Sequence, residues 1–389
     1  MTGAPIRVWY ADGPGAPRMS PAAAVEAAGL DPERPLEVTL GWTLERPTWL
    51  DADPPATVRT LLAGYGIGRA VDDGRVDAPP VRLSAVPSLI AAAPPHVAVI
   101  GGIRRGSRLA FARSLGWFDV LAAAADAVVV ELADEGDATD LGAPLIPGTI
   151  VATMPRPSAP DGASAARSPD EVDLRIGALV ASLLPDDPTL QFGPGGIGLG
   201  IARAVDRPVR IWSGLVTEPM AALHERGLLR APAVAAYTWG GRPIDELAAA
   251  GMLHLTSTTV THDITRLSAI PRMIGCNTAV QVGLDGSVNV ERVSRRTIAG
   301  VGGHSDFCVG ASRSPGGLAV VALRSTTTAG ASTIVPAVDV VSTPRSDVSV
   351  VVTEHGIADL RGIGDAERSR RMTAIAAPEH RDRLASSAT

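Results

Sequence analysis

Glu218 is the acidic residue best placed to act on a bound ligand. It stands in WSGLVTEPM, just beyond the carboxyl end of the predicted strand VRIWSG, and it opens a predicted helix together with Pro219. Open α/β sheets bind ligands at the carboxyl ends of their strands, which favours a functional role. Spacing alone leaves a second role open, in which the carboxylate only complements the dipole of the helix.

A glycine-rich stretch that precedes Glu218 matches the sequence pattern of dinucleotide-binding loops. PTLQFGPGGIGLGIARAV, residues 188–205, spells G-x-G-x-x-G at Gly193, Gly195 and Gly198. A dinucleotide fold places an acidic residue at the end of the second strand, roughly 20 residues on. The strand VRIWSG delivers no acid before Glu218. We therefore expect no dinucleotide here, and the glycines can also simply permit a tight strand-to-helix turn.

A second glycine cluster lies in AGVGGHSDFCVGASRS. Gly300, Gly302 and Gly303 could expose successive backbone N–H groups as a nest for an oxyanion or a phosphate. An ordinary turn before a helix, with Asp306 as its cap, explains the same residues. The pattern alone does not choose between the two.

The histidines and cysteines give no sign of a metal site or a thiol nucleophile. His254, His262 and His304 lack metal-ligand spacing, and we expect hydrogen-bonded or surface roles for them. Cys276 and Cys308 are predicted to be small buried residues. No G-x-S-x-G motif occurs, so a serine hydrolase of that type is unsupported.

Composition excludes several function classes. All 35 cationic residues are arginine, which rules out a P-loop lysine, a pyridoxal Schiff base and a lysine nucleophile. The net charge of -6, without a basic run, argues against a nucleic-acid surface. The opening residues have no apolar core typical of a signal peptide, and the longest apolar stretch is too short for a bilayer. We expect a cytoplasmic protein.

The pattern of elements predicts an α/β protein of two domains. Apolar strand-like runs such as HVAVIGG, AVVVEL, TLQFG, GGLAVVAL and VSVVVTE alternate with alanine-rich helical segments. Residues 155–173 resemble a linker, DEVDLRIGALVASLL an amphipathic helix, and VGLDGSVNV a hairpin around Asp285-Gly286. At 389 residues, the chain is long enough for two cores.

Several segments together resemble the acetyl-CoA hydrolase / CoA-transferase family, whose members include 4-hydroxybutyrate CoA-transferases. LQFGPGGIGLGIARAV is similar to the family's LQ-G-I-G-x-I-P-x-A loop, and SGLVTEPM to its G-(I/L)-H-(S/T)-E-M. IGCNTAVQVGLDGSVNVE, GVGGHSDFCVGASRSPGG and STIVPAVDVVSTPRSDVSVVVTEHGIADLRG follow three further family motifs in order. The resemblance is strong from about Leu190 to Leu384 and weaker before that.

The resemblance implies a fold and a chemistry. It implies two CoA-transferase-type α/β domains with mostly parallel or mixed sheets and helices on both faces. We expect these at residues 1–185 and 186–389, the second carrying the catalytic glutamate. Glu218, at the family's (S/T)-E position, would attack an acyl-CoA and carry CoA as a glutamyl thioester, with ping-pong kinetics. Our candidates for oxyanion and substrate binding are Asn277, Gly302, Gly303, Gly195 and Gly196.

Other residues and partners follow from the same resemblance. His304, Glu354 and Arg313 are candidates for lining the site, and arginine must supply any contact to the CoA phosphates. We expect acyl-CoA and a small carboxylate as substrates, no permanently bound cofactor, no metal, and a homodimer or higher homo-oligomer. An acyl-CoA hydrolase and a diverged CoA-binding protein stay open as alternatives. The chain departs from the family pattern at four positions: His304, Gly198, Gly283 and Val216.

Overall fold

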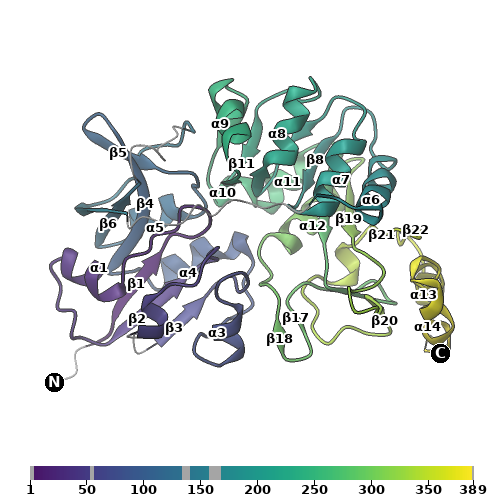
Figure 1. Ribbon diagram of the computed structural model, residues 1–389, viewed down its shortest axis with the longest axis horizontal. Coiled ribbons are helices and arrows are strands. Elements are labelled where there is room, and N and C mark those ends of the chain that lie inside the picture. Colours follow the sequence, from purple (N-terminus) through teal and green to yellow (C-terminus); the bar gives the residue numbers. More distant parts are fainter. Residues whose placement is uncertain (1–3, 53–56, 134–140, 157–167, 388–389) are drawn as a thin grey trace. The chain divides into compact units, whose positions relative to one another are not determined.

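The computed structural model describes residues 4–52, 57–133, 141–156 and 168–387, which form two compact units (Figure 1). Unit 1 comprises Met1–Ala163, Val234–Thr261 and Arg296–Gly302. Unit 2 comprises Ser164–Ala233, His262–Arg295 and Gly303–Thr389. This division differs from the predicted boundary between residues 185 and 186, because two later segments return to unit 1.

Unit 1 is built on a mostly parallel sheet with the strand order β3-β2-β1-β4-β6-β7 (Figure 1). Only β5 (Arg108–Phe111) is antiparallel to its neighbour β4 in this sheet. The remaining strands are β1 (Ile6–Tyr10), β2 (Leu36–Leu40), β3 (Thr57–Thr60), β4 (Val97–Arg105), β6 (Ala127–Leu132) and β7 (Ile150–Pro155). The helices are α1 (Pro21–Ala27), α2 (Trp49–Ala52), α3 (Gly68–Asp72), α4 (Val86–Ala92), α5 (Phe118–Ala124), α9 (Arg242–Ala249) and α10 (Thr258–Thr261). Short strands β12 (Tyr237–Trp239), β13 (Leu253–Leu255) and β18 (Arg296–Thr297) complete the unit.

Unit 2 has its own sheet with the strand order β22-β21-β19-β14-β8-β9 (Figure 1). All of its pairs are parallel except the one between β21 and β22. Its strands are β8 (Thr189–Phe192), β9 (Arg210–Ile211), β14 (Met273–Thr278), β19 (Leu318–Ala322), β21 (Val350–Thr353) and β22 (Gly356–Asp359). Its helices are α6 (Glu171–Ala181), α7 (Gly196–Ala204), α8 (Glu218–Glu225), α11 (Ile264–Ala269), α12 (His304–Arg313), α13 (Asp365–Ile375) and α14 (Arg381–Ser386).

A smaller sheet in unit 2 contains the predicted hairpin. Strands β15 (Gln281–Gly283) and β16 (Val288–Asn289) pair antiparallel around Asp285-Gly286, and β20 (Ile334–Val335) adds to β15. Gly286 has φ +91°, a conformation that glycine adopts without strain. The chain also forms the short strands β10 (Leu215–Thr217), β11 (Ala233–Ala235) and β17 (Arg292–Val293).

The apolar runs of the sequence form the interior of each sheet. Every residue of β8, β19 and β21 is buried, and so are the first five of β6. Continuous burial is what a parallel strand covered on both faces requires. The prediction of an α/β fold with two main, mostly parallel sheets is thus confirmed. Within the predicted linker, β7 ends at Pro155 and α6 begins at Glu171, while residues 157–167 lie outside the described residues.

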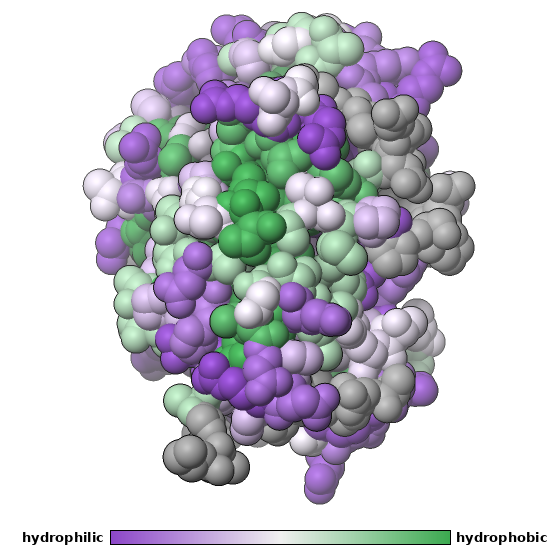
Figure 2. All heavy atoms as spheres, turned by 90° about the vertical axis from the view of Figure 1, so that its left-hand side faces the viewer, coloured by the Kyte–Doolittle hydropathy of each residue, from purple (hydrophilic) through white to green (hydrophobic). Residues whose placement is uncertain are grey.

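One surface of unit 1 is apolar. Figure 2 shows side chains of hydrophobic character gathered in a band on this face, with polar ones around them. In the same unit, the edge strand β7 exposes Val151 and Met154, at 45% and 37%. A band of apolar side chains with polar ones around it is typical of an interaction site.

Candidate active site

The carboxyl ends of the parallel strands in unit 2 bring several predicted site residues to one edge of the sheet. Asn277 lies near the end of β14, and Glu354 directly follows β21. Gly195 lies in the turn after β8, and Gly196 begins α7. Because β8, β14, β19 and β21 are parallel in register, these positions share the edge at which open α/β sheets bind ligands.

The side-chain amide of Asn277 is held by the neighbouring strand. Gln191 Nε2 of β8 donates to Asn277 Oδ1 at 3.2 Å, and Asn277 Nδ2 faces Cys308 Sγ at 4.0 Å. With its oxygen engaged by Gln191 and one N–H donated to Cys308 Sγ, the Asn277 amide retains its second N–H as a donor. This is the group that a developing oxyanion needs. Sequence reasoning missed Gln191, although a polar residue inside a buried strand was a signal for it.

A polar chain continues from Asn277 into helix α12. Cys308 Sγ lies 3.7 Å from His304 Nδ1, which in turn lies 2.8 Å from Thr343 Oγ1. His304 Nε2 is buried and has no hydrogen-bond partner among the described residues. Burial lowers the pKa of His304 from 6.5 to about 4, so the imidazole is neutral near pH 7. A neutral ring can accept or donate a hydrogen bond to a bound substrate without adding charge.

The two thiols are unsuited to nucleophilic attack. Burial raises the pKa of Cys276 to about 12 and that of Cys308 well above its ordinary value. The thiolate is the reactive form of cysteine, and it is suppressed at both positions. This agrees with their prediction as buried structural residues.

The buried His304 predicts a loss of stability in mild acid. Below pH 6.5 the unfolded chain takes up a proton at this position, whereas the folded chain does not until about pH 4. The free energy of unfolding therefore decreases by about 1.4 kcal/mol per pH unit as the pH falls through this window. The His304→Gln variant restores the glutamine of the family motif and has no group that titrates at this position. Between pH 7 and pH 5, we expect its free energy of unfolding to fall by roughly 2 kcal/mol less than that of the parent.

Urea denaturation at the two pH values measures this difference. The exposed His254→Gln is the matched control and should keep the pH dependence of the parent. Asp12, whose pKa burial raises to about 7, acts in the opposite direction, so the comparison must be made between variants. Equal pH dependence in His304→Gln and the parent would contradict the expected effect.

Gly302 and Gly303 form the turn that starts helix α12. Gly302 has φ +56°, and Gly303, at φ −89° and ψ −1°, caps the helix. A left-handed residue followed by a right-handed one is the alternation that a backbone nest requires. The Gly302 carbonyl accepts the N–H of Leu83 at 3.1 Å, which holds Gly302 in place. Gly303 is therefore our first candidate for a backbone N–H donor.

His262 joins this turn to the segment that leads to Glu218. A β-carbon at position 303 would lie 2.5 Å from His262 Nε2, and one at position 214 would lie 2.9 Å from the same atom. Both glycine backbones therefore lie against the imidazole, which also contacts the ring of Phe307 at a centroid distance of 4.9 Å. Burial lowers the pKa of His262 to about 3. The prediction from sequence gave His262 no role at the site, because its neighbours are distant in the chain.

Shortening His262 should disturb the candidate site without removing a reacting group. We expect His262→Ala to lower kcat for acyl-CoA turnover by roughly 10- to 100-fold, because a backbone donor moved by about 1 Å loses much of its effect. The KM for acyl-CoA should change little. His262→Phe, which keeps a flat ring against Gly303, should retain more activity than His262→Ala. Steady-state kinetics measure these effects. An unchanged kcat in His262→Ala would show that His262 does not position the Gly303 backbone.

Glu218 is the first residue of helix α8, as predicted. Thr217 at the end of β10 is the N-cap, and Pro219 occupies the first turn. The Glu218 side chain is half-buried at the N-terminus of this helix. The preceding strand β9 is parallel to β8, so the chain enters this segment from the same carboxyl edge that carries Asn277.

Glu354 holds a chain segment in place at the same edge of the sheet. Its carboxylate accepts hydrogen bonds from Ser325 N at 2.9 Å and Ser325 Oγ at 2.6 Å. The adjacent Arg324 pairs with Asp173 at 2.8 Å. Glu354 thus fixes the segment after β19, and its position next to the strand ends is compatible with lining the site.

The glycines of the fingerprint-like stretch allow two helices to approach closely. A β-carbon at Gly196 would lie 2.1 Å from Asp173 Oδ2, and one at Gly200 would lie 2.3 Å from the Asp173 carbonyl oxygen. On the facing helix α6, a β-carbon at Gly177 would lie 2.2 Å from the Gly200 backbone. Gly195, at φ +100°, has no heavy atom within 4 Å of that position. Gly195 is therefore the member of this stretch with open space beside it.

Arg313 is not brought to the carboxyl edge. It ends α12, and the next residue, Ser314, accepts a hydrogen bond through Oγ from the backbone N–H of Met273 at 3.1 Å. Met273 begins β14, so Arg313 lies at the amino edge of the sheet, away from Asn277. Its candidacy for lining the site gains no support from this position.

Unit 1 carries a buried carboxyl at its own strand ends. Asp12 follows β1 and is 1% exposed, with Oδ2 accepting the N–H of Trp42 at 3.3 Å. Burial raises its pKa to about 7. The strand order reverses between β1 and β4, and open α/β sheets bind ligands at such a point. Sequence reasoning did not single out Asp12.

Two features are absent from the described residues. No group of three or more His, Cys, Asp or Glu residues is arranged to hold a metal ion. No helix of the described chain has both the length and the apolar character needed to cross a membrane.

Comparison with known proteins finds similarity to one family over part of the chain. Residues 244–388 match the model described as Acetyl-CoA hydrolase/transferase C-terminal domain. The 4-hydroxybutyrate coenzyme A transferase of Clostridium kluyveri is 31% identical over 229 residues, covering 55% of this chain and 53% of that protein. The acetyl-CoA hydrolase of Eremothecium gossypii is 30% identical over 212 residues, covering 52% of this chain and 40% of that protein. The matches thus span about half the length, or less, of these curated relatives.

A solved structure matches over nearly the whole chain. The crystal structure of 4-hydroxybutyrate CoA-transferase from Porphyromonas gingivalis aligns with a TM-score of 0.71 at 23% identity. The alignment covers 97% of this chain and 92% of that one. At this identity the likeness establishes the fold and nothing finer.

Proposed function

We propose that the chain transfers CoA between a short-chain acyl-CoA and a carboxylic acid through a thioester on Glu218, because it is similar to the acetyl-CoA hydrolase/transferase family. One observation carries the proposal. A half-buried carboxylate stands at the N-terminus of α8, in the same unit as the Asn277 amide and the Gly303 turn. That combination supplies a nucleophile and donors for an oxyanion.

The proposed reaction begins with attack by a Glu218 carboxylate oxygen on the acyl-CoA carbonyl carbon. The C–S bond breaks, CoA thiolate leaves, and an acyl-glutamyl anhydride remains. The thiolate then attacks the glutamyl carbonyl and displaces the acyl group as its carboxylate, which leaves glutamyl-CoA. An acceptor carboxylate repeats the two steps in reverse order and regenerates Glu218. No net proton is gained or lost in the cycle.

The surrounding residues suit this chemistry. Each step passes through a tetrahedral oxyanion, for which the Asn277 amide and the Gly303 N–H are our donors, with Gly302 setting the turn. A carboxylate is already ionised near pH 7, so no general base is needed. The neutral imidazoles of His262 and His304 add no charge that would pair with Glu218 and weaken it. Gly195 and Glu354 complete our proposed site at the strand ends.

Acyl-CoA hydrolysis is the second candidate. The similar protein from Eremothecium gossypii is a hydrolase by name, and the same nucleophile serves both reactions. In hydrolysis, water attacks the anhydride or the thioester instead of a carboxylate, and a proton is released.

An exchange assay separates the two candidates. The protein is incubated with acetyl-CoA, with and without butyrate or 4-hydroxybutyrate, while new acyl-CoA and free thiol are followed. A transferase forms the new acyl-CoA and releases little thiol without acceptor. Thiol release that ignores the acceptor identifies the hydrolase. Absence of both products with a panel of acyl-CoAs would refute the proposal.

We also propose that the chain works as a homodimer or higher homo-oligomer, as expected from the family. The exposed apolar side chains of edge strand β7 support an association surface in unit 1. Light scattering after size exclusion tests the assembly state, and a single species of 39.9 kDa would contradict it.

A further inference from the structure

The amino edge of the main sheet in unit 2 carries a group of arginines that the proposed chemistry does not use. Arg210 begins β9, and Arg272 directly precedes β14. Arg230 lies beside them, because its backbone N–H donates to the carbonyl of Val209 at 2.9 Å. The guanidinium groups of these three arginines meet on the carboxylate of Asp187, just before β8. We call these four residues the Asp187 cluster, and all of them belong to unit 2.

The single carboxylate of the Asp187 cluster does not neutralise its guanidinium groups. Arg210 Nη1 donates to Asp187 Oδ1 at 2.6 Å, and Arg272 Nη2 donates to Asp187 Oδ2 at 2.9 Å. Arg230 Nη1 lies 3.5 Å from Oδ1 in an ion pair without a hydrogen bond. Among the described residues, none of these guanidinium groups has a partner other than Asp187. The exposed Asp186 precedes Asp187, and an excess of positive charge remains when both carboxylates are counted.

The Asp187 cluster is open to ions in solution. The side chains of Arg210, Arg230 and Arg272 are 44%, 49% and 43% exposed, whereas that of Asp187 is 29% exposed. Each guanidinium group carries several N–H donors, and most of them are left for a further acceptor. Guanidinium groups match the oxygens of a phosphate group, to which they donate pairs of hydrogen bonds. The chemistry of the cluster therefore favours a multiply charged oxyanion.

The backbone of the Asp187 cluster has an uncommon conformation at two positions. Asp187 and Arg272 both have φ +53°, in the left-handed region that is costly for a residue with a side chain. Arg272 Nε donates to the Asp187 carbonyl oxygen at 3.1 Å, and the Arg272 carbonyl accepts the N–H of Thr189 at 3.1 Å. Such outliers persist where the surrounding structure holds them, and they cluster at ligand sites. These contacts fix the two turns relative to each other.

We propose that the Asp187 cluster binds a phosphate group, with Arg210, Arg230 and Arg272 donating to its oxygens. The ligand is either inorganic phosphate or the phosphate of a small phosphomonoester. The cluster lies at the opposite edge of the sheet from Asn277, and the inference does not depend on the proposed function. Asp187 holds the guanidinium groups together in the absence of phosphate and competes with phosphate for them.

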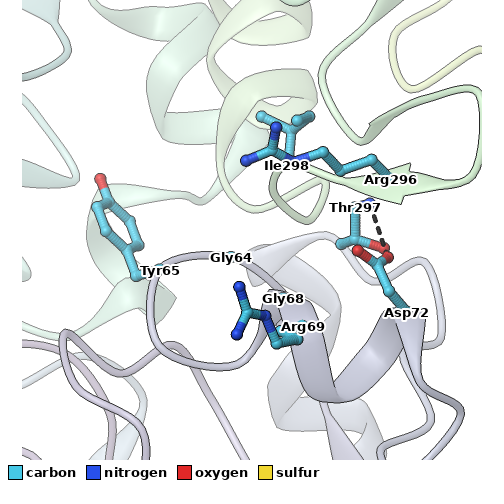
Figure 3. A pocket seen from close by; sticks show the side chains of 8 residues that line it. All are labelled: Gly64, Tyr65, Gly68, Arg69, Asp72, Arg296, Thr297 and Ile298. Carbon is cyan, nitrogen blue, oxygen red and sulfur yellow. Dashed lines mark hydrogen bonds between the residues drawn. The ribbon is translucent and has the colours of Figure 1, made fainter.

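A second pair of arginines, in unit 1, serves as the comparison for this cluster. Arg69 and Arg296 lie on the two chain segments that line a pocket of ≈ 740 Å³ (Figure 3). The acidic residue that lines this pocket, Asp72, accepts the N–H of Thr297 at 2.8 Å. No carboxylate among the lining residues gathers the two guanidinium groups, so we expect weaker phosphate binding here than at the Asp187 cluster.

Isothermal titration and the unfolding temperature of the full chain measure phosphate binding, with chloride keeping the ionic strength constant. The parent should bind inorganic phosphate saturably. Arg230→Gln, which keeps both hydrogen bonds to Asp187, should weaken this binding roughly 10-fold. Asp187→Asn should lower the unfolding temperature in the absence of phosphate. The same variant should bind phosphate roughly 10-fold more tightly than the parent, because it lacks the competing charge.

Two further measurements complete the test. Titration with glycerol 3-phosphate separates the two sources of the ligand, since tighter binding than that of inorganic phosphate identifies a phosphomonoester. Arg175→Gln is the matched control, because Arg175 is an exposed arginine of unit 2 without a partner among the described residues. It should bind phosphate as the parent does.

A purely structural role of the Asp187 cluster predicts different results. Asp187→Asn would then lower the unfolding temperature, but phosphate would neither bind more tightly nor restore that temperature. This result, or an unchanged affinity in Arg230→Gln, would overturn the inference, and so would a parent that binds no phosphate. Loss of phosphate binding in a double variant with Arg69→Ala and Arg296→Ala, but not in Arg230→Gln, would assign the phosphate to unit 1 and also overturn it.

Discussion

Glu218→Ala is expected to lower CoA transfer by more than roughly 10⁴-fold, because the variant has no nucleophile to form the anhydride and the thioester. The fold should survive, since alanine favours a helix and position 218 is only half-buried at the start of α8. Binding of CoA should remain, because Glu218 is proposed to act on the acyl carbonyl and not on the rest of the CoA molecule. Initial rates of acyl-CoA exchange measure the effect, with titration of CoA as the check on binding.

Two further variants sharpen this expectation. Glu225→Ala removes an exposed glutamate at the other end of the same helix and should leave the rate unchanged. Glu218→Asp keeps the charge but withdraws the carboxylate by one methylene, so it should retain only a small fraction of the activity. If Glu218→Ala turned over acyl-CoA as well as the parent, covalent transfer through this residue would be excluded.

Asn277→Ala is expected to lower kcat by about 10²–10³-fold, the usual cost of losing one oxyanion donor. The KM for acyl-CoA should change much less, because the amide is proposed to act on the oxyanion of the transition state rather than on the ground-state carbonyl. Rates at saturating acyl-CoA separate the two effects.

Neighbouring residues supply the controls for Asn277. Thr278→Ala removes the next, exposed side chain of β14 and should leave kcat unchanged. Gln191→Ala removes the hydrogen bond that orients the amide and should give a loss smaller than that of Asn277→Ala. An equal drop in activity for Thr278→Ala and Asn277→Ala would point to general damage at the strand end instead of a donor role.

Local patterns in the sequence were sufficient to predict the main elements. The strands β4, β6, β8, β19 and β21 can be recognised in the sequence as apolar runs, because buried parallel strands are continuously hydrophobic. The hairpin at Asp285-Gly286 was legible because its turn chemistry is local. The division into units could not be predicted from local patterns. Residues 234–261 and 296–302 join unit 1 through long-range packing, which leaves no local pattern in the sequence.

The same contrast holds for the candidate site. Asn277 and Glu354 were named from the family resemblance, and the structure brings them to one edge because the end of β14 and the residue after β21 belong to one parallel sheet. His262 could not be connected to Gly303 from sequence, since their contact depends on how distant segments pack. The position of Arg313 away from the site could have been predicted from the length of its helix. A helix of ten residues is about 15 Å long, which is enough to place its last residue at the opposite edge of the sheet.

The most direct test of the central claim is to trap the intermediate on Glu218. The protein is incubated with acetyl-CoA without an acceptor, treated with borohydride, digested and analysed by mass spectrometry. The account predicts that the peptide containing residue 218 carries a glutamate whose carboxyl has been reduced to an alcohol, and that omitting acetyl-CoA abolishes this change. A peptide left unmodified at Glu218, from protein that turns over acyl-CoA under the same conditions, would contradict it.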